Sequence, residues 1–141
     1  METQISRKLK MLGMVLFLLG LLSGFAIMGL KNPRMGLATH LEGVMNGTFL
    51  VLAGIIWNDL LLSEKAQKIA LFTLLYGTFA NWFFTLLSAI WGTSKMTPLS
   101  GAGFSGSGMQ ENVVSAGLIS IGLTMVISLI LLVYGLRKKI N

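Results

Sequence analysis

Four long apolar stretches constrain this chain more than any other feature of its sequence. They cover about residues 11–30, 38–62, 69–91 and 113–136, and each is as long as a membrane-spanning helix, which needs roughly 20 mainly apolar residues. A mean hydropathy of +0.78 and a charged fraction of only 11% are likewise typical of membrane proteins. The sequence therefore predicts one all-α integral membrane domain over residues 1–141, a helical bundle with four transmembrane helices.

The basic residues lie at the ends of these stretches and predict the orientation of the bundle. Eight of the 11 Lys and Arg residues fall in the N-terminal segment, the second connection and the C-terminal segment, whose three are Arg137, Lys138 and Lys139. The other two connections hold three. Because cytoplasmic segments carry the excess of Lys and Arg, we expect both termini in the cytoplasm, with the bundle in a bacterial inner membrane. These topology signals explain the net charge of +6 without a nucleic-acid partner.

Polar side chains at the start of the second stretch form the first candidate site. His40 is the only histidine of the chain, and Glu42 and Asn46 follow it. Ionisable groups within a membrane span are costly and usually face a protein interior or a cavity. Glu42 lies about 200° around the helix from His40, so no small pocket of one subunit can hold both, although a subunit interface could bring them together. Glu42 and Asn46, four residues apart, share a face.

The third stretch carries a second polar stripe on an aromatic-rich helix. Asn81 is its least easily explained member, because the hydroxyls of Thr85 and its neighbours usually bond to their own backbone in membrane helices. Tyr76 lies earlier on the same stretch. The connection that follows is rich in Gly and Ser over residues 98–108, a composition that favours a flexible linker over a loop folded across a site.

The short inventory of reactive side chains excludes several kinds of site. Without cysteine there is no disulfide, thiolate-bound haem or iron–sulfur cluster. A zinc site with three protein ligands would need more carboxylates than Glu42 near His40. A single imidazole is sufficient as the axial ligand of a haem iron, and it also suits a proton relay or substrate binding. A structural histidine bonded to a loop carbonyl is the remaining interpretation.

The pattern His40-x5-Asn46-Gly47 resembles the hydroxylaminobenzene mutases and styrene oxide isomerases, a family of small membrane enzymes. Asn81 in an aromatic third helix and a Gly-rich connection before the fourth helix extend the resemblance to most of the chain. The segment of residues 40–47, His-Leu-Glu-Gly-Val-Met-Asn-Gly, resembles the mutase branch more closely than the epoxide isomerase branch. The resemblance implies a homo-oligomer, a trimer of four-helix subunits that binds haem b between neighbours, with a histidine on the iron and an asparagine and a tyrosine near a small aromatic substrate.

The family's site residues can be carried over by position. His40 would be the ligand of the haem iron, and Asn46 would face the substrate. On the face of His40, Gly43 and Gly47 would offer a smooth surface to the flat macrocycle, and Asn81 would complete the cofactor site. The family's tyrosine falls on Thr85, a departure that weakens the epoxide-isomerase reading. The remaining candidates for a catalytic polar group, beside Asn46, are Thr85 and Tyr76.

The resemblance implies an isomerase that converts arylhydroxylamines to 2-aminophenols, with ferric haem as a Lewis acid and no net redox change. In the first alternative, the same site opens an arene epoxide such as styrene oxide to an aldehyde. A rival from another class is a small multidrug exporter, which is similar in length and hydropathy but needs a carboxylate in its first helix. Residues 11–30 contain none. A third possibility is a structural or assembly protein.

Overall fold

A computed structural model describes residues 3–137, which form four long helices and no strand within that range. The helices are α1 (Gln4–Ala26), α2 (Pro33–Ile56), α3 (Glu64–Trp91) and α4 (Gly108–Leu136). Short 3-10 turns, Ile27–Gly29 and Trp57–Asp59, continue α1 and α2. All four helices are long and apolar enough to cross a membrane, which confirms the predicted four-helix membrane bundle. Lys138 and Lys139, two of the cations that predict the orientation, lie outside the described residues.

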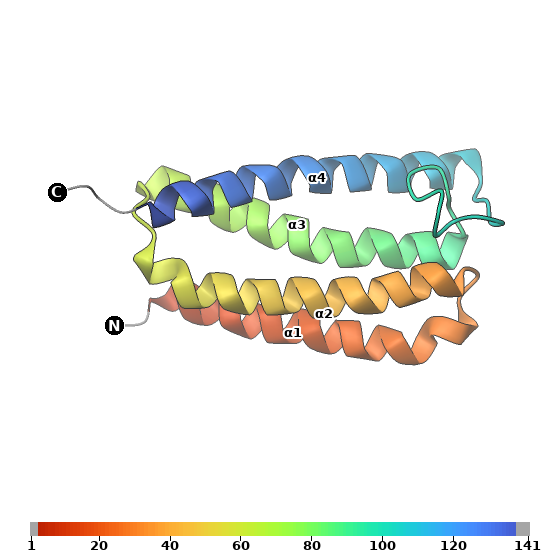
Figure 1. Cartoon of the computed structure of the whole chain (residues 1–141), viewed down its shortest axis with the longest axis horizontal. Coiled ribbons are helices and arrows are strands. Elements are labelled where there is room, and N and C mark those ends of the chain that lie inside the picture. Colours follow the sequence, from red (N-terminus) through yellow and green to blue (C-terminus); the bar gives the residue numbers. More distant parts are fainter. Residues whose placement is uncertain (1–2, 138–141) are drawn as a thin grey trace.

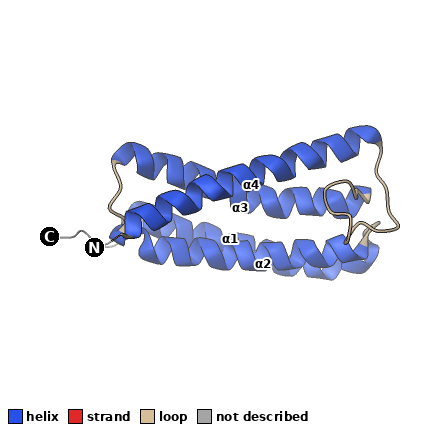
Figure 2. Cartoon of the chain, turned by 45° about the horizontal axis from the view of Figure 1, so that its top comes forward, coloured by secondary structure: helices blue, strands red, loops and turns tan. Residues whose placement is uncertain are grey.

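Each helix packs against the next one in the sequence. The contacts run from α1 to α2, from α2 to α3 and from α3 to α4, and no other pair of these four helices packs to a comparable extent. Figures 1 and 2 show the α1–α2 pair beside the α3–α4 pair, with the start of α1 and the end of α4 at one end of the bundle. These two helix ends therefore lie on the same side of the bundle. That this side is the cytoplasm stays a prediction.

The start of α2 differs from the boundary predicted by sequence. Asn32 caps this helix, because its Oδ1 accepts hydrogen bonds from the backbone N–H groups of Arg34 and Met35 at 3.0 and 3.2 Å. Pro33 is the first helical residue, a position where its missing N–H costs nothing. The helix thus begins at Pro33, before the start near residue 38 that the apolar stretch predicts. His40 consequently lies about two turns inside α2 rather than at its head.

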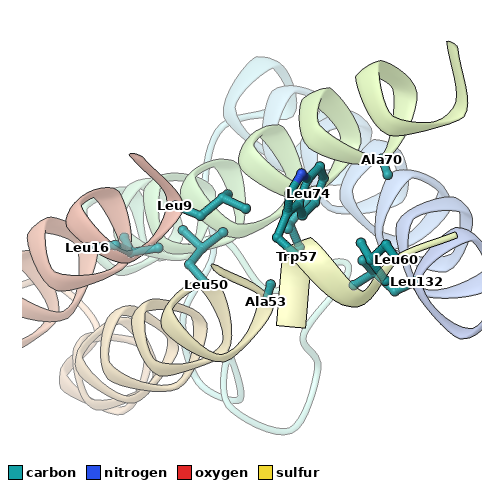
Figure 3. Close-up of a cluster of buried hydrophobic side chains, with 9 residues drawn as sticks. All are labelled: Leu9, Leu16, Leu50, Ala53, Trp57, Leu60, Ala70, Leu74 and Leu132. Carbon is teal, nitrogen blue, oxygen red and sulfur yellow. The ribbon is translucent and has the colours of Figure 1, made fainter. Parts of the chain in front are cut away.

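The apolar core lies in the half of the bundle near the termini. Its buried side chains come from all four helices and from the segment after α2, as Figure 3 shows: Leu9, Leu16, Leu50, Ala53, Trp57, Leu60, Ala70, Leu74 and Leu132. Trp57 is the largest of them and is only 3% exposed. This cluster joins the α1–α2 pair to the α3–α4 pair. His40, Glu42 and Asn81 lie nearer the end of the bundle that carries the long connection.

The long connection between α3 and α4 is folded rather than free. The carboxylate of Glu111 accepts hydrogen bonds from three backbone N–H groups of this segment, those of Ser94, Lys95 and Gly106. From the α1–α2 turn, Asn32 Nδ2 and Lys31 Nζ donate to carbonyl oxygens of the segment at 2.9 and 2.8 Å. The flexible linker favoured by the composition of residues 98–108 is therefore wrong, because side chains outside the segment hold it in place.

Candidate functional site

Glu42 is the centre of a polar cluster between α2 and α3. Its Oε2 accepts a hydrogen bond from Nδ2 of Asn46, one turn further along α2, at 2.9 Å. The same oxygen accepts from Nδ2 of Asn81 on α3 at 2.6 Å. Asn46 is buried, whereas Glu42 and Asn81 are half-buried. An ionised carboxyl group only accepts hydrogen bonds, and both of its neighbours here are donors.

The structure brings together two residues that the sequence analysis placed in separate roles. Asn46 was expected to face the substrate and Asn81 to line the cofactor site, yet both amides meet on one carboxylate oxygen of Glu42. The spacing of Glu42 and Asn46 already indicated a shared face. Asn81 is 39 residues further along the chain than Glu42, so this contact depends on how α3 is aligned against α2.

His40 lies on the opposite side of α2, against α1. Its Nδ1 is 2.8 Å from the carbonyl oxygen of Gly20. Because a carbonyl oxygen can only accept, Nδ1 carries the hydrogen of this bond, and in a neutral imidazole Nε2 then has the lone pair. The half-buried ring lines an apolar groove of about 560 Å³. The other lining residues of this groove are Leu18, Leu21, Leu22, Gly24, Phe25, Ile27 and Leu37.

The surroundings of His40 suit the iron of a haem. Metal-binding histidines usually donate their other ring N–H to a carbonyl or a carboxylate, which fixes the tautomer and the ring orientation. The bond from Nδ1 to Gly20 has this form. A haem needs only one axial nitrogen from the protein and an apolar surface for its ring. Among residues 3–137 no group of three or more His, Cys, Asp or Glu side chains forms a site for a bare metal ion.

Gly43 and Gly47 lie inside the contact between α1 and α2. A Cβ atom on Gly43 would lie 2.3 Å from Cα of Gly20, and one on Gly47 would lie 2.5 Å from the backbone nitrogen of Phe17. Helix α1 therefore covers the face that was expected to receive a flat macrocycle. This corrects the expectation of an open surface: the two glycines let a neighbouring helix of the same chain approach closely.

Tyr76 and Thr85 do not join the Glu42 cluster. The hydroxyl groups of Tyr76 and Ser120, on α4, share a hydrogen bond of 2.7 Å on the α3–α4 side. Thr85 is buried, one turn after Asn81. Within the described chain, neither residue is hydrogen-bonded to Glu42, and Asn46 has Glu42 as its side-chain partner. Within the described chain Tyr76 therefore lies apart from the Glu42 cluster, and catalytic roles for Tyr76 and Thr85 stay predictions.

Trp82 is a residue that the sequence analysis did not single out. A Cβ atom on Gly43 would lie 2.9 Å from its Cδ1, so the indole packs beside the close contact of α1 with α2. Its Nε1 is buried and has no hydrogen-bond partner among residues 3–137. A buried indole N–H usually has a partner. The sequence showed only that this helix is rich in aromatic residues, which does not distinguish Trp82 from its neighbours.

Comparison with known proteins relates this site to a family. A sequence profile described as styrene oxide isomerase matches residues 5–137. The chain belongs to the styrene oxide isomerase family. Hydroxylaminobenzene mutase HabB of Ectopseudomonas oleovorans is 44% identical over 138 residues, which cover 97% of this chain and 84% of that protein. Hydroxylaminobenzene mutase HabA of the same organism is 56% identical over 39 residues, 28% of this chain and 29% of that protein. No solved structure matches the chain significantly.

Membership in the styrene oxide isomerase family confirms the resemblance carried by residues 40–47. The similarity to HabB over almost the whole chain supports the mutase branch of that family. The same similarity supports an isomerase activity, and neither comparison supports a multidrug exporter. The cluster around Glu42 and the groove at His40 are therefore two parts of a candidate active site.

Proposed function

We propose that this chain is a membrane-embedded mutase that converts hydroxylaminobenzene-type arylhydroxylamines to 2-aminophenols. The observation that carries this proposal is the 44% identity to HabB, a protein named hydroxylaminobenzene mutase, over 97% of the chain. The polar cluster supports it chemically. An arylhydroxylamine carries an N–H and an O–H donor, and the oxygen atoms of Glu42, Asn46 and Asn81 are acceptors suited to both.

The proposed cofactor is haem b, whose iron His40 would hold. The hydrogen bond from Nδ1 to Gly20 leaves Nε2 free to bind iron, and the groove beside α1 offers apolar side chains to the macrocycle. When bound, ferric haem supplies a Lewis-acid site that polarises an N–O bond without net redox change. Gly43 contributes indirectly, because its contact with Gly20 places that carbonyl against the ring of His40.

The polar cluster has a positioning role in this proposal. Glu42 holds the NH₂ ends of Asn46 and Asn81, which fixes the direction of both amide groups. Asn46 then presents a fixed amide to the nitrogen or oxygen of the substrate. The apolar side chains that line the groove at His40 would keep water away from the aromatic ring, where it would compete for the positive charge that develops as the N–O bond breaks.

The proposed active unit contains more than one copy of the chain. His40 and Glu42 lie on opposite sides of α2, so a second subunit is needed to bring both to one substrate. Only 22% to 39% of the residues in the apolar window of each helix are buried, which leaves surface for neighbouring subunits as well as lipid. A homotrimer, as the family resemblance implies, is our choice. The excess of basic residues favours a bacterial inner membrane with cytoplasmic termini.

The second candidate activity is the opening of an arene epoxide to an aryl acetaldehyde. The description of the family profile favours it. Thr85 disfavours it, since this threonine occupies the position at which the resemblance places a tyrosine. A phenol hydroxyl can donate a proton to an epoxide oxygen more readily than an aliphatic hydroxyl, because its pKa is near 10.

Two measurements on the purified protein test the proposal. Protein from haem-replete cells should show an intense Soret band that His40→Ala removes, whereas a colourless, stable wild-type protein would contradict the haem assignment. Incubation with hydroxylaminobenzene should form 2-aminophenol. Turnover of styrene oxide alone would overturn the mutase assignment. Thr48→Ala is a matched control, because Thr48 is exposed on α2 and its hydroxyl donates only to the backbone of its own helix.

A further inference from the structure

The contact between α2 and α3 does not by itself require a carboxyl group at residue 42, because it uses only one oxygen of Glu42. Its Oε2 holds both asparagines, while its Oε1 has no hydrogen-bond partner among residues 3–137, and the side chain is only half-buried. A neutral glutamine oxygen could accept the same two hydrogen bonds. A carboxylate inside a membrane span is costly and usually has a function. The open oxygen therefore calls for a chemical explanation.

The mutase reaction needs a group that moves a proton. When hydroxylaminobenzene becomes 2-aminophenol, the N–O bond breaks and a C–O bond forms at the ortho carbon. That carbon then loses its hydrogen as a proton, and the nitrogen gains one proton. Isomerisation of an aryl epoxide to an aldehyde differs, because its hydrogen migrates to the neighbouring carbon together with the bonding electron pair. Only the first reaction needs a base that accepts a proton from carbon and returns it to nitrogen.

We propose that Glu42 is this proton carrier, an inference that rests on the proposed mutase function. Its Oε1 takes the proton from the ortho carbon that has received the hydroxyl group. The electron pair of the broken C–H bond restores the aromatic ring, and the π pair of the C=N bond moves to the nitrogen. The nitrogen then takes the proton back from Glu42, so no proton, electron or co-reactant is consumed.

The two asparagines prepare Glu42 for this step. Both donate to Oε2, at 2.9 and 2.6 Å, and therefore hold the carboxyl plane from two helices. Oε1 remains free for the substrate. Glu42 thus gives the site the base that the mutase reaction needs. The opening of an aryl epoxide to an aldehyde does not need this base.

The test uses Glu42→Gln and hydroxylaminobenzene deuterated at both ortho carbons. Glutamine keeps an oxygen for both asparagines but cannot carry the proton. We expect kcat to fall at least about 100-fold, the usual contribution of a general base, and a primary deuterium isotope effect larger than that of the wild type. A merely structural role would lower the rate without changing the isotope effect. Glu64→Gln is the control, because Glu64 is exposed at the opposite end of the bundle.

A second variant guards against misfolding of the first. Glu42→Ala should regain part of its turnover when formate, a small carboxylate, is added, while Thr48→Ala should not respond. An unchanged Soret band and thermal midpoint in Glu42→Gln show that its fold and cofactor are intact. If the wild type forms 2-aminophenol but Glu42→Gln has the wild-type rate and isotope effect, the role of Glu42 is overturned and the mutase function stands. If the wild type forms none, the mutase function fails and the role of Glu42 fails with it.

Discussion

The two ionisable side chains in the middle of α2 are each held by a different neighbouring helix. The carbonyl of Gly20 on α1 fixes the ring of His40, and Asn81 on α3 fixes the carboxyl group of Glu42. Neither orientation is a property of α2 alone. Displacement of α1 should therefore affect the histidine and the proposed cofactor, whereas displacement of α3 should affect the carboxylate and the chemistry.

Replacement of Asn46 by alanine tests this separation. Asn46→Ala leaves Glu42 with one amide donor, and a hydrogen bond to a charged group contributes about 1.5–3 kcal/mol. We expect kcat/KM for hydroxylaminobenzene to fall by about 10- to 100-fold. The Soret band should remain, because His40 lies on the other side of the helix. Loss of the band together with activity would assign Asn46 to cofactor binding or folding instead, and Thr48→Ala should change neither.

Several features of the site could be predicted from the sequence, and others could not. Helical geometry alone placed His40 and Glu42 on different sides of α2 and Asn46 beside Glu42, and the structure confirms both. The bond from Asn81 to Glu42 depends on the alignment of two helices, which residue spacing within one helix does not contain. The hydrogen bond of Tyr76 to Ser120 on α4 depends on helix alignment in the same way.

At the scale of the helices, the closest approach in the bundle is that of α1 and α2. Gly43 and Gly47 made a smooth face of the second stretch predictable, but they did not reveal that α1 covers it. The ends of the helices were less predictable from the sequence than the presence of four membrane-spanning helices. Asn32 caps α2, and its side chain also donates a hydrogen bond to Ser100 in the long connection. A tertiary contact therefore supports the start of this helix at Pro33.

Gly43→Ala tests the role of this close contact. The added methyl group would lie 2.3 Å from Cα of Gly20, so the backbone of α1 must move. We expect the free energy of unfolding to fall by about 1–3 kcal/mol, as is usual for overpacking. The Soret band should weaken as well, because the carbonyl of Gly20 holds His40.

Gly122→Ala is the matched control for that variant. Gly122 is exposed on α4, and an added Cβ atom would meet nothing within 4 Å. Alanine stabilises a helix interior relative to glycine, so the thermal midpoint of Gly122→Ala should stay the same or rise slightly. Equal midpoints and Soret bands in the two variants would show that the α1–α2 contact tolerates a methyl group, which would contradict the argument.

At the scale of the whole molecule, the candidate site borders the apolar core on the side of the long connection. The core near the helix ends joins all four helices, and the Glu42 cluster begins about one turn beyond it on α2. Four apolar stretches were enough to predict the fold class. They were not enough to predict which surfaces meet lipid and which meet another subunit, because both surfaces are apolar.

Co-expression of two inactive variants tests whether the active site lies between subunits. If His40 and Glu42 of different copies act on one substrate, oligomers that mix His40→Ala with Glu42→Gln contain some interfaces with both wild-type side chains. Mixed oligomers purified through two different affinity tags should therefore regain activity that neither variant has alone. A mixture of Glu42→Gln with Asn46→Ala is the control, because these residues belong to one cluster within a chain, and mixing cannot restore it. Mixed oligomers of the first pair that are no more active than the control would place the whole site within one chain.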